Sequence, residues 1–363
     1  MICKNILKIN LGNIKYNYHY LSNIVSSRVS AVLKANAYGL GMIEISQILV
    51  LEGCRDFFTS TFDEALALRH SHKQQDINIY VLNGLFEKEM EESMIHNIVP
   101  VINHLDQLKI YNDFAKKHSK ILPMILHFDT GMNRLGMEEA EVLELVNNKH
   151  LISNVKISYI MSHLSISEDK ENPRNIDQRN RFLEYIRYFP STKLSLANSS
   201  GIFLGKEYHF DMVRSGASLY GINPYQGKPN PMKNPVSLHS YILQLRDVKK
   251  GQYVGYSNGF FSDRDIKVAT IPIGYADGYK RVDNSKAYVI IGGEKAKVIG
   301  NVSMDLTTID VTHISDEKLY LGAKVEVIGP SIHHDILGLM QNTIGYEVLT
   351  SLGNRYMREY VNE

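Results

Sequence analysis

The sequence predicts an N-terminal (β/α)8 barrel followed by a mostly-β domain. Short apolar runs alternate with amphipathic stretches through roughly the first 220 residues, which is the pattern of a parallel sheet whose strands are joined by helices. Beyond Gly221 the long amphipathic stretches stop, and strand-like runs follow one another. We therefore expect a barrel domain of residues 1–225 and a β-rich domain of residues 226–363.

Eight apolar runs are expected to form the barrel strands, at residues 30–33, 57–60, 77–82, 98–102, 122–128, 156–161, 193–196 and 211–213. Apolar residues at three-to-four spacing predict helices between several of them, at residues 63–70, 105–117, 138–147 and 177–188. Eight such strands fit a closed barrel. A doubly wound open sheet is the competing architecture, but no G-x-G-x-x-G sequence follows the first run.

The second domain follows a stretch rich in proline and glycine, residues 223–231, which is typical of a linker. Its predicted strands are residues 240–248, 267–273, 287–291, 295–299 and 324–328. One helical stretch, at about residues 335–343, interrupts them.

Composition excludes several classes of partner. The 363 residues carry 40 Lys and Arg against 39 Asp and Glu, so no charge excess points to nucleic acid or to an anionic membrane. The only cysteines, Cys3 and Cys54, form no C-x-x-C pair, which argues against a disulfide scaffold and a structural zinc site, and we expect no metal. The N-terminus lacks the apolar segment of a signal peptide, and no apolar run is long enough to span a bilayer. We expect a cytoplasmic protein.

Reactive side chains in such a barrel lie at the carboxyl ends of the strands. Lys34 ends the first predicted strand, and His163 and Arg214 lie at the ends of later ones. A desolvated lysine amine loses its proton more readily and can form a Schiff base with a carbonyl group. The ordinary alternative is a lysine whose amine reaches from the strand end into water.

Small residues follow the last two predicted strands, in Ser199-Ser200-Gly201 and Ser215-Gly216-Ala217. Backbone N–H groups of loops at this place in a barrel commonly bind phosphate. A lysine, a phosphate-binding loop and an arginine together indicate pyridoxal phosphate.

On its motifs the chain resembles the bacterial alanine racemases, two-domain pyridoxal-phosphate enzymes of fold type III. The motifs in the first domain are VLKANAYGLG at 32–41, DTGMNRLG at 129–136, ANSSG at 197–201 and VRSGASLYG at 213–221. Those in the second are PIGYADG at 272–278, SMD at 303–305 and GYE at 345–347. The resemblance covers essentially the whole chain, with the motifs in order.

The resemblance implies roles for particular residues. Lys34 would bind the cofactor covalently and then act as a base, and Arg214, with His163 beside it, would face the pyridine nitrogen. Because a guanidinium only donates hydrogen bonds, it would keep that nitrogen unprotonated. The phosphate would be held by Tyr38, Ser199, Gly216, Ala217 and Tyr346.

Racemisation needs a second base, because the proton leaves one face of the α-carbon and returns to the other. The resemblance assigns this role to Tyr256, reaching the partner subunit's barrel in a homodimer. Arg134 would bind the carboxylate of alanine, with the partner's Met304. Tyr275 and Tyr346 would form an inner gate, and Glu168 and Arg281 the outer entrance. The product D-alanine would serve peptidoglycan synthesis.

The sequence departs from the family pattern at positions that carry no reacting group. His127 replaces a lysine that is carbamylated in many members and steadies the arginine corresponding to Arg134, and Ser195 replaces a frequent histidine. Asn301 replaces an arginine of the outer entrance, and Ser303 a frequent cysteine.

Three other functions are weighed against alanine racemisation. A broader small-amino-acid or serine racemase is the hardest to exclude, because a hydrophobic pocket rejects an added hydroxyl only weakly. A pyridoxal-phosphate-binding protein that is not an enzyme would share Lys34 but lack the second domain and Tyr256. A fold-type-III decarboxylase would need a cysteine in the second domain, whereas both cysteines lie near the N-terminus.

Overall fold

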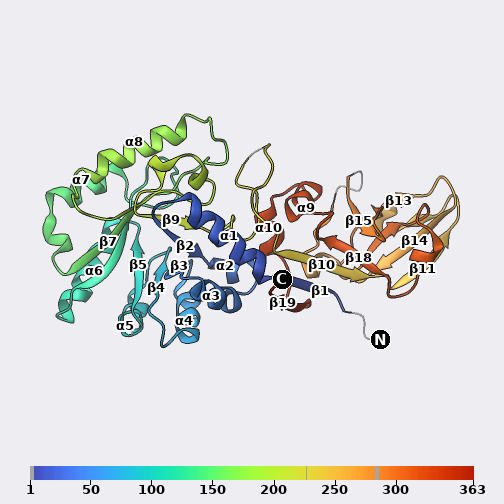
Figure 1. The fold of residues 1–363 in the computed structure, drawn as a ribbon, viewed down its shortest axis with the longest axis horizontal. Coiled ribbons are helices and arrows are strands. Elements are labelled where there is room, and N and C mark those ends of the chain that lie inside the picture. Colours follow the sequence, from blue (N-terminus) through green and yellow to red (C-terminus); the bar gives the residue numbers. More distant parts are fainter. Residues whose placement is uncertain (1–3, 226, 283–285) are drawn as a thin grey trace. The chain divides into compact units, whose positions relative to one another are not determined.

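The computed structural model describes residues 4–225, 227–282 and 286–363, and these form two compact units (Figure 1). The barrel unit comprises Lys15–Ala37 and Gly41–Met232, and the β unit comprises Met1–Ile14, Tyr38–Leu40 and Lys233–Glu363. In the second half of the chain the boundary between the two units therefore falls between Met232 and Lys233. The predicted domain boundary at residues 225 and 226 stays a prediction.

Eight parallel strands form the barrel, in the order β8-β7-β6-β5-β4-β3-β2-β9. They are β2 (Arg28–Val32), β3 (Asp56–Thr59), β4 (Asn78–Val81), β5 (Ile98–Ile102), β6 (Leu122–His127), β7 (Val155–Met161), β8 (Leu194–Ser195) and β9 (Met212–Ser215). The first and last strands pair in parallel. Hydrogen bonds from Asp211 N to Leu194 O (3.0 Å) and from Arg214 N to Ala197 O (2.9 Å) link β8 to β9. The predicted barrel is confirmed, and the open doubly wound sheet is wrong.

The helices before and between these strands are α1 (Leu11–Ile24), α2 (Lys34–Tyr38), α3 (Met42–Leu51), α4 (Phe62–Ser71), α5 (Glu87–Ile95), α6 (Leu105–Lys117), α7 (Glu139–Asn147) and α8 (Arg174–Ile186). The predicted helices correspond to α4, α6, α7 and α8. The sequence pattern did not reveal α3 or α5. Helix α3 is apolar along most of its length, and α5 buries only Met90 and Ser93 of its nine residues, so neither shows a clear apolar stripe.

A nine-stranded sheet forms the β unit, in the order β11-β14-β17-β16-β15-β18-β10-β1-β19. Its strands are β1 (Ile6–Asn10), β10 (Val236–Tyr241), β11 (Gln244–Val248), β14 (Ile266–Ile271), β15 (Tyr288–Ile291), β16 (Glu294–Ile299), β17 (Thr307–Asp310), β18 (Lys324–Ile328) and β19 (Met357–Val361). Strands β12 (Tyr253–Val254) and β13 (Phe260–Phe261) form a small separate pair, and α9 (His334–Met340) and α10 (Gly345–Thr350) complete the unit.

The predicted strand at residues 240–248 is wrong as a single element. The chain leaves β10 at Tyr241 and begins β11 at Gln244. Between them, Ile242 N donates to Ala323 O (2.9 Å) and Leu243 N donates to Thr270 O (2.8 Å). At these two residues the chain crosses from one part of the sheet to another. Because both are apolar, the sequence pattern does not show that β10 ends before β11 begins.

The first strand of the chain belongs to the β unit. Strand β1 pairs antiparallel with β10 and parallel with β19, and its Leu7 and Ile9 are fully buried. The N-terminal and C-terminal strands are therefore neighbours in one sheet. Among the described residues, no helix is long and apolar enough to cross a membrane.

Candidate active site

Lys34 begins a left-handed turn directly after β2. Ala35, Asn36 and Ala37 have φ values of 53°, 53° and 52°, and Tyr38 follows at 57°. The left-handed region costs an L-residue about 1–2 kcal/mol, so four such residues in succession are held there by their surroundings. Strain of this kind is concentrated at functional sites. The turn therefore marks Lys34 as a residue whose position matters.

Glu64 of α4 holds the start of this turn. Its Oε1 accepts a hydrogen bond from Ala35 N (2.6 Å), and its Oε2 accepts one from Ser60 N (2.9 Å). Glu64 is also the third helical residue of a capping box with Thr61. Our sequence reasoning missed this residue, although the T-x-x-E signature of a helix start was readable.

The amine of Lys34 lies in an environment that disfavours its charge. Burial lowers the pKa of Lys34, the positive charge of Arg134 lowers it further, and Glu64 opposes the shift. A lysine with a lowered pKa presents more of its unprotonated, nucleophilic form. The structure thus supports the chemical interpretation of Lys34 over that of an amine in open water.

Arg214 on β9 is a buried cation without a carboxylate partner among the described residues. Its Nη1 donates to Ser195 Oγ (2.6 Å), and its Nη2 donates to the carbonyl oxygens of Ser162 (2.6 Å) and Leu196 (3.3 Å). Ser195 in turn donates to Met212 O (2.7 Å), so its lone pairs face the guanidinium. Burial lowers the pKa of Arg214 to about 9.

Each ring nitrogen of His163 has a side-chain nitrogen nearby, and a neutral ring can accept a hydrogen bond at only one of the two positions. Arg214 Nη2 is 3.4 Å from its Nδ1, and Asn198 Nδ2 is 3.4 Å from its Nε2. The Asn198 amide is fixed in this orientation, because its Oδ1 accepts from Gly201 N (2.9 Å) and Ser167 Oγ (2.7 Å). Burial and then the charge of Arg214 hold the pKa of His163 well below its usual range, so the ring is neutral.

The loops after β8 and β9 form a cluster of hydrogen-bond donors. Ser199 Oγ accepts from Gly216 N (2.9 Å) and Ser218 N (3.2 Å), and Ala217 is buried between them. The Ser215 and Ser218 hydroxyls are buried and have no hydrogen-bond partner among the described residues. These two hydroxyl donors suit an anion such as phosphate, so the loops after β8 and β9 fit the phosphate of pyridoxal phosphate.

Arg134 is carried by a loop that Asp129 organises after β6. The Asp129 carboxylate accepts from the backbone nitrogens of Gly131, Met132 and Asn133, each at 2.9 Å. The Arg134 side chain itself is exposed. A loop fixed by three backbone hydrogen bonds keeps the guanidinium available to a small anion.

His127, at the end of β6, is buried and has a fixed tautomer. Asn103 Nδ2 donates to Leu82 O (3.0 Å) and Val101 O (3.2 Å), so Asn103 Oδ1 faces His127 Nδ1 at 2.8 Å as the acceptor. Nδ1 therefore carries the proton, and Nε2 keeps its lone pair. Burial and then the charge of Arg214 lower the pKa of His127 to about 3. No sequence pattern pointed to Asn103.

The β unit brings together two further pairs of predicted residues. The rings of Tyr38 and Tyr346 are 6.1 Å apart, centroid to centroid, and burial raises the pKa of Tyr38. Tyr275 N donates to Ser303 O (3.2 Å), and Ala276 N donates to Met304 O (3.0 Å). Tyr275 and Met304 are thus held on adjoining backbone segments, with both side chains about half exposed.

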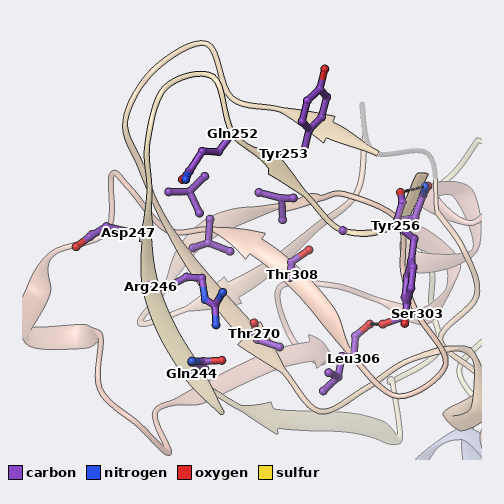
Figure 2. Close-up of a pocket in the computed structure, with 15 residues that line it drawn as sticks. Gln244, Arg246, Asp247, Gln252, Tyr253, Tyr256, Thr270, Ser303, Leu306 and Thr308 are labelled. Atoms are coloured by element: carbon purple, nitrogen blue, oxygen red, sulfur yellow. Dashed lines mark hydrogen bonds between the residues drawn. The ribbon is translucent and has the colours of Figure 1, made fainter. Parts of the chain in front are cut away.

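Tyr256 lines a pocket of about 800 Å³ in the β unit, shown in Figure 2. Ser303 is another of the residues that line this pocket. Tyr256 is 73% exposed, and its carbonyl accepts a hydrogen bond from Asn301 Nδ2 (3.0 Å). The next residue, Ser257, has a φ of 56°, so this turn too is strained. Glu168 and Arg281 are both exposed, one in each unit.

The predicted residues can therefore be sorted into two groups by the unit to which they belong. The barrel group comprises Lys34, Arg134, His163, Ser199, Arg214, Gly216 and Ala217. The β-unit group comprises Tyr38, Tyr256, Tyr275, Met304 and Tyr346.

Comparison with known proteins gives a consistent result. The family models for the N-terminal and C-terminal domains of alanine racemase match residues 9–224 and 235–360. An alanine racemase from Rickettsia canadensis is 46% identical over 355 residues, which is 98% of each chain. One from Rickettsia bellii is 47% identical over 342 residues, covering 94% of this chain and 82% of that protein.

Solved structures agree. The crystal structure of alanine racemase from Bartonella henselae, with covalently bound pyridoxal phosphate, has a TM-score of 0.95 at 38% identity and covers 99% of this chain and 100% of that one. The biosynthetic alanine racemase from Pseudomonas aeruginosa has a TM-score of 0.90 at 27% identity, with 99% of each chain covered. Together with the two matching family models, these relatives show that the chain belongs to the alanine racemase family.

Proposed function

We propose that this chain interconverts L-alanine and D-alanine with two bases, Lys34 on one face of the substrate and the partner subunit's Tyr256 on the other. Family membership makes it a pyridoxal-phosphate-dependent isomerase that racemises alanine. The observation that carries the assignment of the first base is the Lys34 amine, whose pKa is lowered on a strained turn at the end of a barrel strand.

Pyridoxal phosphate, when bound, supplies an electron-withdrawing ring that acidifies the substrate α-carbon. Lys34 would bind it covalently, and the phosphate would be held by Ser199, Gly216, Ala217, Tyr38 and Tyr346. Arg214 would donate to the pyridine nitrogen. Its hydrogen bonds to Ser195 and Ser162 would hold the guanidinium in place, and because it only donates, the ring nitrogen would remain an unprotonated acceptor.

The substrate carboxylate would be bound by Arg134, helped by the partner's Met304. The Asp129-organised loop supports this role, because it fixes the backbone immediately before the residue that carries the exposed guanidinium. Tyr275 and Tyr346 would restrict the inner gate to small side chains, and Glu168 and Arg281 would line the outer entrance.

We further propose that the enzyme is a homodimer with shared active sites. The exposure of Tyr256 (73%) and Met304 (53%) on the β unit supports this, because both would otherwise be solvated. We also propose that the D-alanine serves peptidoglycan synthesis. A cytoplasmic location stays a prediction from the sequence.

A broader activity on serine is the second candidate. The gate residues would select by size, and one hydroxyl changes the size of the side chain little. Parallel assays with L-serine would separate the two.

The test is α-proton exchange in D₂O with L-alanine, D-alanine and L-serine. We expect Tyr256→Phe to lose exchange from one alanine enantiomer and to lower racemisation by about 10²–10⁴-fold, the usual contribution of a general base, while the cofactor stays bound. Tyr253→Phe, which alters an exposed tyrosine of the same pocket, is the matched control and should racemise normally. A Tyr256→Phe enzyme as fast as the wild type would refute the two-base assignment.

Lys34 is tested separately through the cofactor. Lys34→Ala should lose the visible absorbance of covalently bound pyridoxal phosphate, because no other amine takes the place of Nζ. Retention of that absorbance would show that the cofactor is attached elsewhere.

A further inference from the structure

Three consecutive residues with metal-ligating side chains lie at the start of helix α9: the N-cap residue His333, then His334 and Asp335. One ligand atom from each lies within 4.8 Å of the other two. The cluster belongs to the β unit, and none of its residues has a part in the proposed racemisation.

The Asp335 carboxylate has an imidazole nitrogen near each oxygen. His333 Nδ1 is 3.3 Å from Oδ2, and His334 Nε2 is 4.0 Å from Oδ1. His333 Nδ1 also accepts a hydrogen bond from Asp335 N (3.2 Å), so its one lone pair lies on the side of Asp335. A metal ion bound at Nδ1 would take the place of this hydrogen bond.

The buried nitrogens of the cluster lack partners. His334 is fully buried, and neither of its ring nitrogens has a hydrogen-bond partner among the described residues. The Nε2 of His333 is in the same situation. Buried polar atoms are almost always satisfied, so this concentration of unpartnered nitrogens indicates a ligand.

Against the expectation of no metal that the cysteines suggested, we propose that His333, His334 and Asp335 bind one divalent transition-metal ion. The chemistry of the donors favours Zn²⁺. Two neutral imidazoles and a carboxylate are typical zinc ligands, and they leave a fourth position for water. Ligand atoms about 2.0–2.2 Å from Zn²⁺ stand roughly 3.3 Å apart in a tetrahedral site, close to the 3.3 Å between His333 Nδ1 and Asp335 Oδ2. The His333 and Asp335 side chains are 23% and 31% exposed, so an ion can enter from solvent.

Helix α10 is a neighbour of α9 (Figure 1). Gly345, the first residue of α10, lies against the cluster: a Cβ atom there would collide with Asp335 Oδ1 and come within 2.9 Å of His334 Cδ2. The next residue is Tyr346, whose ring faces Tyr38. We therefore expect metal binding to stiffen the segment that presents Tyr346.

The test is a metal titration of the cofactor-loaded enzyme after dialysis against a chelator. We expect one Zn²⁺ per chain by calorimetry, a higher melting temperature with Zn²⁺, and visible d–d absorption when Co²⁺ is used as the probe. His333→Ala and Asp335→Asn should each weaken Zn²⁺ binding at least tenfold. Both leave the buried His334 in place, so neither depends on refilling a core position.

His19→Ala is the matched control. His19 is an exposed histidine of α1 that contacts Glu52 at 2.7 Å, far along the chain from the cluster, and the chain has 14 histidines in all. This variant should bind Zn²⁺ as the wild type does. Absence of saturable binding, or equal binding by the His333→Ala and Asp335→Asn variants, would overturn the proposal.

Discussion

Several groups that can carry positive charge act on one another at the mouth of the barrel. Burial and then the charge of Arg214 lower the pKa values of His127 and His163, and burial and then the charge of Arg134 lower the pKa of Lys34. Arg214 itself relies on carbonyl and hydroxyl oxygens for its stabilisation. The two histidines stay neutral as a result, and the charge that remains suits a phosphate and a substrate carboxylate.

The neutrality of His127 makes a prediction about stability and pH. Its pKa of about 3 in the folded chain is below the ordinary value of 6.5, so the unfolded chain binds a proton first as pH falls. The stability due to neutral His127 is complete above about pH 6.5 and is lost towards pH 3, by up to about 1.4 kcal/mol per pH unit. His127→Gln lacks this titration.

The comparison is made by thermal denaturation of both proteins at pH 7.5 and pH 5. The wild type should lose more of its melting temperature than His127→Gln over this range. The other histidines are common to both proteins, so their contributions cancel in the difference. Equal losses would show that His127 titrates normally in the folded chain.

A functional side chain can be predicted from the sequence where the residues next to it in the chain indicate its role. Lys34 and Arg214 could be proposed because each is a cation at the end of an apolar run. Asn103 could not, because its role rests on hydrogen bonds to Leu82, Val101 and His127, residues brought together only by the barrel. The sequence shows which side chains are present, but contacts between residues far apart in the chain depend on the fold.

Among the elements, the left-handed turn α2 is the most unusual. It links β2 to α3 through four residues with positive φ, three of which are not even asparagine or glycine. The turn replaces the ordinary right-handed start of a helix and fixes the direction in which Lys34 leaves the strand. The same left-handed turn therefore both carries the backbone strain and sets the position of Lys34.

Replacing Ala35 by glycine tests that strain. Ala35 is exposed, so the change removes no packing, and relief of about 1–2 kcal/mol should outweigh the roughly 0.5–1 kcal/mol that glycine loses in backbone entropy. We expect unchanged or slightly higher stability by chemical denaturation, together with a lower kcat because Lys34 is held less firmly.

Ala140→Gly provides the control. Ala140 is an exposed alanine in the right-handed helix α7, where glycine should destabilise the protein by roughly 0.5–1 kcal/mol. If Ala35→Gly destabilises the protein as Ala140→Gly does, the turn carries no relievable strain.

A helix or strand could be predicted where its own residues show the full apolar pattern of that element. Helix α6 runs over the predicted residues, and β5 does the same, because each shows a complete pattern between clear ends. The break between β10 and β11 was missed because apolar residues continue through it. Burial pattern alone does not distinguish a strand that ends from one that changes partners.

At the scale of the whole molecule, the chain crosses between its two units more than once. Strand β1 lies in the sheet of the β unit, between β10 and β19, although the barrel unit follows it in sequence. No local pattern reveals such a pairing, because it depends on residues more than 200 positions away. The proposed bases are likewise divided, Lys34 in the barrel unit and Tyr256 in the β unit.

This division leads to the central claim, that each active site takes Lys34 from one subunit and Tyr256 from the other. The direct test is a heterodimer of a Lys34→Ala chain and a Tyr256→Phe chain, isolated through two different affinity tags. In a symmetric dimer with shared sites, one of its two sites has both bases intact, so two inactive parents should give about half the wild-type activity. A heterodimer no more active than its parents would contradict the claim, because both bases would then have to come from the same chain.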